Sequence, residues 1–194
     1  LNVTTPVIFK DNIVIVTWDR AIEVYDLYSG KTKWKLKYIN KISKRFGGKK
    51  FNNNGSNSWG GISLDEKRGI LYFTTGNPHF YFDGTQRPGN NPNSSSLIAV
   101  DLEKKEFIWS FQETSHDIWN SDLPAPPILT SIIKDKKKID VVVTPTKRSN
   151  TLILDRLTGD PIFDYRFSKA PISKLTGEKT SFYQPDLEIQ EPFG

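Results

Sequence analysis

The stretch Val24–Trp34 (VYDLYSGKTKW) recurs twice further along the chain, as Ala99–Trp109 (AVDLEKKEFIW) and, more weakly, as Ile153–Phe163 (ILDRLTGDPIF). Each copy is interpreted as a strand, an aspartate, a tight turn, a second strand and an aromatic residue. The aspartate can accept hydrogen bonds from turn amides, and the aromatic side chain can pack against a neighbouring sheet. One four-stranded sheet cannot bury both of its faces, so we expect these units to stack radially, as the blades of a propeller do.

Strand-like segments dominate the rest of the sequence, because short runs of β-branched and aromatic residues alternate with Asp, Gly and Ser turns. No segment has a sustained helical period of apolar residues. The predicted strands are Pro6–Phe9, Asn12–Trp18, Ile22–Tyr25, Thr32–Leu36, Gly69–Thr74, Leu97–Val100, Phe107–Phe111, Ile139–Val143, Thr151–Leu154 and Pro161–Phe163. The fold class is therefore predicted to be all-β, a β-propeller of four-stranded antiparallel blades. Long insertions at 39–58 and 77–96 are interpreted as loops.

The composition excludes several classes of site. The 194 residues include no cysteine, which excludes disulfides, thiolate zinc sites, a CxxCH haem attachment and a cysteine nucleophile within this segment. The net charge of +5 is concentrated locally, with nine basic residues between positions 31 and 50 and a short run at 134–138. These runs are interpreted as solvated faces. Nucleic-acid binding would need basic residues interleaved with stacking aromatics on one face; no such motif is recognisable, and no nucleic-acid partner is expected. No apolar run approaches the ~20 residues of a membrane helix. Because the chain begins abruptly in a strand, we expect it to be a piece of a longer protein.

The Asp-x-x-x-Gly-x-x-x-Trp repeat resembles the tryptophan-docking motif of the quinoprotein dehydrogenases, which are eight-bladed propellers that bind pyrroloquinoline quinone (PQQ). Further blocks of the sequence resemble that family in the same order: Trp59–Asp65, Gly76–Pro78, Arg87–Asn91, His116–Trp119, Asp122–Pro126, Pro145–Lys147, Gly177–Thr180 and Gln184–Pro185. The resemblance covers nearly the whole chain. It implies that residues 1–194 are part of a single PQQ-type propeller domain, about three partial blades of an eight-bladed ring.

The resemblance implies roles for three residues. Trp59 matches the tryptophan that stacks under the PQQ ring system, although a core or blade-docking tryptophan is the alternative by itself. Asn77 matches an amide oxygen ligand of the family's calcium, which is apt for a hard cation. Its alternative is an ordinary Gly-Asn-Pro turn. Lys147 matches the lysine that contacts the quinone oxygens in the sugar- and polyol-oxidising branch, with a turn lysine beside Arg148 as the alternative.

The sequence departs from the family at the catalytic base. The resemblance implies an aspartate directly after the tryptophan of the His-Asp-x-Trp block, and that position is Asn120. A side-chain amide is not basic near neutrality and cannot take a proton from a hydroxyl. Asp122 is the favoured replacement, because it would lie on the same side as Asn120 in an extended segment. Its equivalent in lanthanide-using relatives is an additional metal ligand. Asp117 is a second carboxylate that stays open.

Three further residues have alternative interpretations. His116 could pair with Asp117 or with a cofactor carboxylate, but a structural hydrogen bond in a turn is favoured. His79, in an aromatic loop, could line the mouth of the site or pack against the propeller face. The family's glutamate ligand is not identified, and Glu23 is interpreted as part of an ordinary strand face.

The resemblance implies an oxidoreductase that uses PQQ with Ca²⁺ or a lanthanide. It would oxidise an alcohol or sugar hydroxyl and pass electrons to a quinone or cytochrome acceptor. The family habit implies a periplasmic location, with membrane association through parts of the protein outside this chain. The alternative function is a non-catalytic, PQQ-like propeller that acts as a binding or assembly scaffold. Asn120 favours that alternative, whereas the joint presence of Trp59, Asn77 and Lys147 argues against it.

Overall fold

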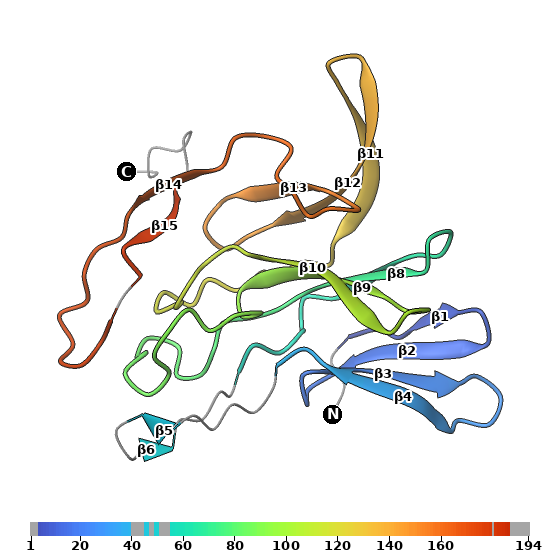
Figure 1. The fold of residues 1–194 in the computed structure, drawn as a ribbon, viewed down its shortest axis with the longest axis horizontal. Coiled ribbons are helices and arrows are strands. Elements are labelled where there is room, and N and C mark those ends of the chain that lie inside the picture. The colour runs from blue at the N-terminus through green and yellow to red at the C-terminus, as the bar shows by residue number, and fades with distance from the viewer. Residues whose placement is uncertain (1–3, 40–44, 47–48, 51–54, 180, 187–194) are drawn as a thin grey trace.

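The computed structural model describes residues 4–39, 45–46, 49–50, 55–179 and 181–186, and every regular element among them is a strand (Figure 1). The first sheet contains β1 Val7–Phe9, β2 Asn12–Thr17, β3 Ala21–Asp26 and β4 Thr32–Lys37. The second contains β7 Ile62–Asp65, β8 Ile70–Thr74, β9 Ser96–Asp101 and β10 Glu106–Gln112. The third contains β11 Ile128–Lys134, β12 Lys137–Pro145 and β13 Thr151–Asp155. Two short pairs complete the set, β5 Arg45–Phe46 with β6 Lys49–Lys50 and β14 Arg166–Lys169 with β15 Tyr183–Asp186.

The prediction of antiparallel blades is confirmed, since all three sheets are antiparallel meanders and the first two have four strands. One predicted strand is wrong. Pro161–Phe163 forms only an isolated bridge between Leu154 and Pro161, so the third sheet lacks a fourth strand. The amides of Asp155 and Ile162 make the two hydrogen bonds that flank this bridge, and the pairing does not extend beyond it. The strands β7, β11, β14 and β15 were not predicted. The predicted loop at 77–96 is confirmed up to the start of β9. The loop predicted at 39–58 is wrong in part, because it contains the short pair β5–β6, and other parts of it lie outside the described residues.

The repeated aspartates close equivalent turns in the three sheets. Oδ1 of Asp101 accepts hydrogen bonds from the amides of residues 103 and 104, at 2.9 and 2.8 Å. Asp26 and Asp155 bind the amides two and three positions ahead in the same way. The residue four positions after each aspartate has a positive φ: 67° at Gly30, 61° at Lys105 and 78° at Gly159. The predicted role of the aspartate is therefore confirmed at all three copies.

The second sheet is buried on both faces, which makes it the centre of the described structure. One face of β8 and β9 packs on the first sheet through Phe73 and Ile98, and the other packs on the third sheet through Tyr72 and Ala99. All five side chains of β8 are buried. Because alternate residues point to opposite faces of a strand, a continuous apolar run is what a sheet between two others requires.

Trp109 joins the second sheet to the third, as the repeat predicts. Its Nε1 donates to the carbonyl of Arg156 at 3.2 Å. A Cβ at Gly159 would lie 2.6 Å from Cδ2 of the indole, so only glycine lets the ring approach this turn. The equivalent residue of the third copy, Phe163, is 54% exposed.

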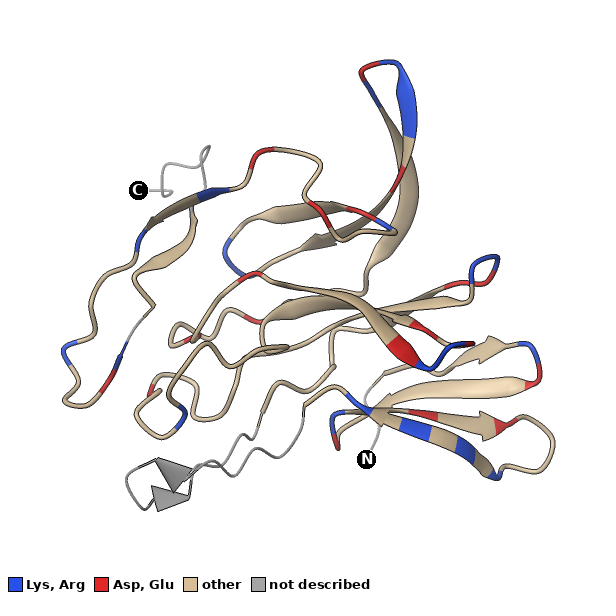
Figure 2. Cartoon of the chain, in the orientation of Figure 1, with Lys and Arg blue, Asp and Glu red and all other residues tan. Residues whose placement is uncertain are grey.

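Basic residues gather on β4 and at the tip of the β11–β12 hairpin (Figure 2). The tip residues 135–138 are exposed, and on β4 Lys33 pairs with Asp26 at 3.0 Å. The side chains described in these runs, at 31–37 and 134–138, therefore lie on solvated surfaces, as predicted, and those of the basic residues at 41–50 are outside the described part. None of the described segments is a helix long and apolar enough to cross a membrane.

Candidate cofactor and substrate site

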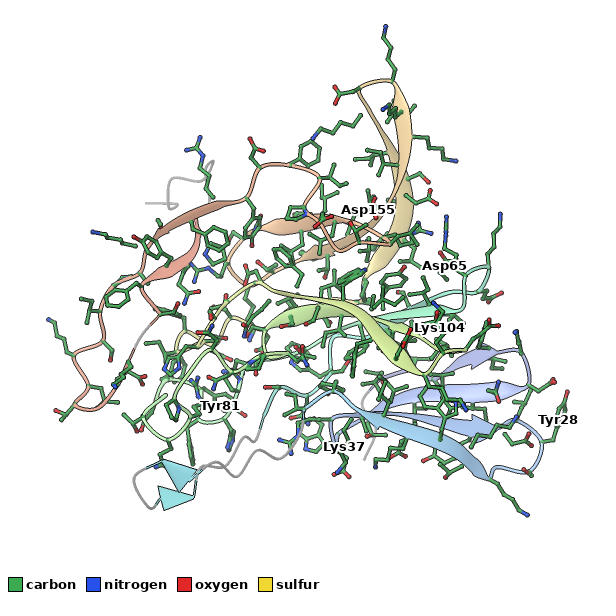
Figure 3. The ribbon with its side chains drawn as sticks, in the orientation of Figure 1. Tyr28, Lys37, Asp65, Tyr81, Lys104 and Asp155 are labelled. Atoms are coloured by element: carbon green, nitrogen blue, oxygen red, sulfur yellow. The ribbon has the colours of Figure 1, made fainter. Side chains whose placement is uncertain are left out.

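A cavity of about 660 Å³ opens at the ends of the sheets opposite the aspartate turns. Figure 3 labels Asp65, Lys104 and Asp155 towards one side of the molecule and Tyr81, a cavity residue, on the other. The five residues singled out for cofactor binding, metal binding or catalysis all line this cavity: Trp59, Asn77, Asn120, Asp122 and Lys147. They come from four separate segments, which the fold brings to one place.

Asp122 connects three of these segments. Its Oδ1 accepts the backbone amide of Asn77 at 2.7 Å, and its Oδ2 accepts a hydrogen bond from the ammonium of Lys147. Its own carbonyl accepts the amide of Lys147 at 3.3 Å. The carboxylate is 6% exposed. A carboxylate this buried needs charge and hydrogen-bond partners, and both are present.

Glycines allow the backbones to approach closely behind the cavity. A Cβ at Gly76 would lie 2.4 Å from Oδ1 of Asp122 and 3.0 Å from Nε1 of Trp59. A Cβ at Gly60 would lie 2.8 Å from the carbonyl oxygen of Leu123. The Gly-Gly and Gly-Asn dipeptides of the sequence therefore mark the points where β7 and β8 meet the segment that carries Asp122.

Trp59 presents an indole to the cavity, with 41% of its surface exposed. The ammonium of Lys147 lies 5.7 Å from the ring centroid, within the range of a cation–π contact. Trp59 is thus not the core tryptophan of the alternative interpretation. It is a partly uncovered aromatic surface beside a positive charge, and it can stack on a planar anionic ligand.

Asn77 is 4% exposed, and its Nδ2 is buried without a hydrogen-bond partner. Its backbone is firmly held, because its carbonyl accepts the amide of Ser56 at 2.7 Å and its amide binds Asp122. A buried side-chain amide with an unpaired atom at a cavity calls for an explanation. A ligand oxygen that accepts a hydrogen bond from Nδ2 would supply it, whereas a cation would bind Oδ1 of the same side chain.

Asn120 and Asp122 both line the cavity, but the reason given from the sequence is wrong. The segment is not extended, because Asn120 has a φ of 60°, in the left-handed region that asparagine tolerates. Asp117 shapes this turn. Its carboxylate accepts the amides of Trp119 at 2.9 Å and Ser121 at 2.7 Å, and the hydroxyl of Ser95 at 2.8 Å.

Asp117 does not line the cavity and is fully buried, and burial raises the pKa of its carboxyl. It therefore stabilises the turn that presents Asn120 and is not placed to take a proton from a substrate.

His116 does not pair with Asp117. Its Nε2 contacts Glu178 and its Nδ1 lies 2.7 Å from the carbonyl of Gly89, so the favoured structural interpretation holds. His79 lines the cavity, and its ring stacks on Phe80 with a centroid distance of 5.0 Å. Glu23 binds Lys35 and Tyr25 and lies outside the cavity lining, as expected for a strand face.

The sequence reasoning missed the wall that the first sheet contributes. Trp18, Asp19 and Arg20, in the turn between β2 and β3, line the cavity with the others. Nothing in the sequence marks this turn as different from the other hairpin turns.

Comparison with known proteins identifies the family of this chain. Residues 2–193 match the family model of the PQQ-type glucose/ethanol/alcohol dehydrogenase β-propeller domain. The glycerol dehydrogenase large subunit of Gluconobacter oxydans (strain 621H) is 28% identical over 95% of this chain and 27% of its own length. The quinoprotein glucose dehydrogenase of Escherichia coli (strain K12) is 30% identical over 72% of this chain and 18% of its own length.

A solved structure has the same fold. The quinohemoprotein alcohol dehydrogenase of Comamonas testosteroni superposes with a TM-score of 0.69 at 22% identity, covering 93% of this chain and 30% of that one. The chain thus spans about a quarter of the length of the Gluconobacter relative and less of the Escherichia relative. Since the family model matches almost every residue, the chain belongs to the PQQ-type glucose/ethanol/alcohol dehydrogenase family and forms part of its β-propeller domain.

Proposed function

We propose that this chain is part of a PQQ-dependent dehydrogenase that oxidises a hydroxyl of an alcohol or sugar. The observation that carries the proposal is the convergence of Trp59, Asn77, Asp122 and Lys147 on one cavity. PQQ is a planar tricyclic quinone with several carboxylates. A half-exposed indole and an adjacent ammonium suit its face and its charge, respectively.

The residues also fit a hard cation in part. Asp122 supplies a carboxylate and Asn77 a side-chain amide, the oxygen donors that Ca²⁺ and lanthanides take. The described residues contain no group of three His, Cys, Asp or Glu side chains that could hold a metal ion. We therefore expect the remaining ligands to come from PQQ and from segments outside this chain.

Different residues of the chain have different roles in the proposed reaction. PQQ, when bound, supplies the electrophilic quinone that accepts a hydride. The hydroxyl proton of the substrate passes to the carboxylate of Asp122, because Asn120 is an amide and Asp117 is buried away from the cavity. Lys147 holds Asp122 in place and offers positive charge to oxygens on which negative charge develops. Loss of the proton and the hydride converts the alcohol to a carbonyl.

Electrons would leave the enzyme for a quinone or cytochrome acceptor, and we propose a periplasmic location from the family resemblance. Asn120 supports a second candidate, a propeller that binds PQQ without turning over substrate. In that case the alternative role is binding or assembly of partners.

The test is dye-linked oxidation of a panel of alcohols and sugars by the full-length protein, loaded with PQQ and either Ca²⁺ or La³⁺. Asn120→Asp is run beside it, and quenching of tryptophan emission reports cofactor binding. Activity of the native sequence is the expected result. Quenching without activity, together with activity in Asn120→Asp, would favour the non-catalytic candidate. Absence of any metal-dependent quenching would contradict both.

A further inference from the structure

A buried network beside the cavity joins three segments that lie far apart in the sequence. His116 is 2% exposed, and the side chain of Glu178 is fully buried. Nε2 of His116 contacts Oε1 of Glu178, while Oε2 of Glu178 accepts the amide of Gly84. The C-terminal segment around Glu178 is thus bonded both to the loop at 79–92 and to the segment that leads to Asn120.

Every polar atom of this pair has a hydrogen-bond partner. Nδ1 of His116 lies 2.7 Å from the carbonyl oxygen of Gly89, which can only accept, so Nδ1 carries a proton. Glu178 already accepts the amide of Gly84 and that of Lys179, the latter at 3.1 Å. Nε2 of His116 and Oε1 of Glu178 share a third hydrogen bond, in which either group can be the donor. The contact therefore joins the two side chains whichever of them carries the proton.

The loop at 79–92 is fixed to this pair by close contact. A Cβ at Gly84 would lie 2.3 Å from Nε2 of His116 and 2.6 Å from Oε1 of Glu178, so the backbone lies directly against both side chains. Arg87, which is 3% exposed, donates to the carbonyls of Phe80 and Asp117. Both halves of the loop therefore depend on buried polar contacts.

The same loop forms part of the cavity wall. His79 and Tyr81 line the cavity, and Tyr81 stands edge-on to the His79 ring at a centroid distance of 5.1 Å. Tyr81 remains 48% exposed, so its position is determined by the loop backbone more than by packing. The contacts that fix the backbone of the loop at 79–92 therefore determine how wide the cavity is beside Tyr81.

We propose that Glu178 and His116 are positioning residues, whose buried pair holds the loop at 79–92 so that Tyr81 and His79 form the mouth of the substrate site. The substrate part of this inference rests on the proposed function, whereas the holding of the loop does not. Neither residue lines the cavity. Their removal acts on substrate binding through Tyr81 and His79, with the PQQ face at Trp59 left intact.

The test uses the full-length protein with PQQ bound and compares Glu178→Ala, Glu178→Gln and the exposed-turn control Glu66→Ala. Glutamine can keep both contacts if His116 is neutral, because its amide group donates to Nε2 and its oxygen accepts Gly84. In Glu178→Ala we expect amide exchange across 80–90 and KM to rise by about tenfold each. The affinity for PQQ should stay within about twofold of the native value. Glu178→Gln should bring both amide exchange and KM most of the way back to the native values.

Unchanged exchange in Glu178→Ala would overturn the proposal, as would faster exchange with an unchanged KM. If Glu178→Ala does not fold, Tyr81→Ala tests the mouth directly. It should raise KM without altering PQQ affinity, and an unchanged KM there would also contradict the proposal. If the native protein oxidises no substrate, the proposed function fails, but amide exchange still decides whether the pair holds the loop.

Discussion

The two ends of the sheets are built in different ways. At one end, each aspartate of the repeat binds amides two and three residues ahead, so Asp26, Asp101 and Asp155 close their turns with local bonds. At the other end, the cavity depends on contacts between distant segments. Asp122 binds Asn77, which is 45 residues away, and Lys147, which is 25 residues away. Each aspartate turn needs only its own residues to form. The cavity, by contrast, depends on a few residues that hold distant segments together.

The largest expected difference between the two ends is in catalysis. Asp122→Asn removes the proposed proton acceptor and the charge partner of Lys147. We expect kcat to fall by about 10²- to 10⁴-fold, the usual contribution of general base catalysis. Asp155→Asn, at the opposite end, is the matched control and should leave kcat unchanged. The measurement is dye-linked oxidation by the full-length protein. Equal kcat values for the two variants would show that Asp122 is not the base.

The next difference concerns glycines. A Cβ at Gly76 would meet Oδ1 of Asp122 at 2.4 Å, whereas a Cβ at Gly30 would meet nothing within 4 Å. Gly76→Ala should weaken PQQ binding and lower the free energy of unfolding by about 1–3 kcal/mol, the typical cost of overpacking. Gly30→Ala should cost only about 1 kcal/mol, because φ at Gly30 is 67°. It should not change PQQ affinity. Denaturant titration and tryptophan quenching measure both effects, and weaker PQQ binding in Gly30→Ala would contradict this separation.

The smallest difference is a pH dependence at Asp65, which combines local and distant contacts. Asp65 binds Arg68 at 2.7 Å within its own turn and Arg156 of the neighbouring sheet at 3.0 Å. Burial alone would raise the pKa of Asp65, but the hydrogen bonds from the two guanidinium groups outweigh burial and lower the pKa below its ordinary value. The lowered pKa means that the folded state favours the carboxylate, so its contribution to stability is present above the unfolded pKa of about 3.9. That contribution is lost as pH falls through the folded value.

Asp65→Asn should therefore lower the free energy of unfolding by about 1–2 kcal/mol at neutral pH. The effect is no larger because Arg68 is partly exposed to water, which weakens its ion pair with Asp65. The difference from the native protein should shrink as pH falls below about 4. Asp65→Asn also leaves Oδ1 to accept a hydrogen bond, so the turn itself is preserved. Urea unfolding at a series of pH values measures the effect. A difference that does not change with pH would mean that shape, and not charge, accounts for the role of Asp65.

Much of the fold was predictable from local patterns. Short runs of β-branched and aromatic residues bounded by Asp, Gly and Ser turns predicted most strands of the three sheets, because pairing between sequence neighbours needs only a turn and a period of two. Pro161–Phe163 pairs with β13 at a single bridge, and nothing in the local pattern indicates that the pairing stops there. The strands β7 and β11 were missed although turns at 66–69 and 135–136 follow them directly, because β7 has only four residues and β11 does not alternate regularly between apolar and polar side chains.

The sequence alone determined that this is an all-β chain of repeated blades, because each aspartate turn is a local pattern. The order of its motifs, through the family resemblance, grouped Trp59, Asn77, Asp122 and Lys147, which the structure places on one cavity. Only the tertiary structure decided that Asp117 is buried away from the cavity, that Trp18, Asp19 and Arg20 line it, and that His116 pairs with Glu178. These relations join residues from different sheets and loops, and their distances depend on how the blades stack, which no local pattern encodes.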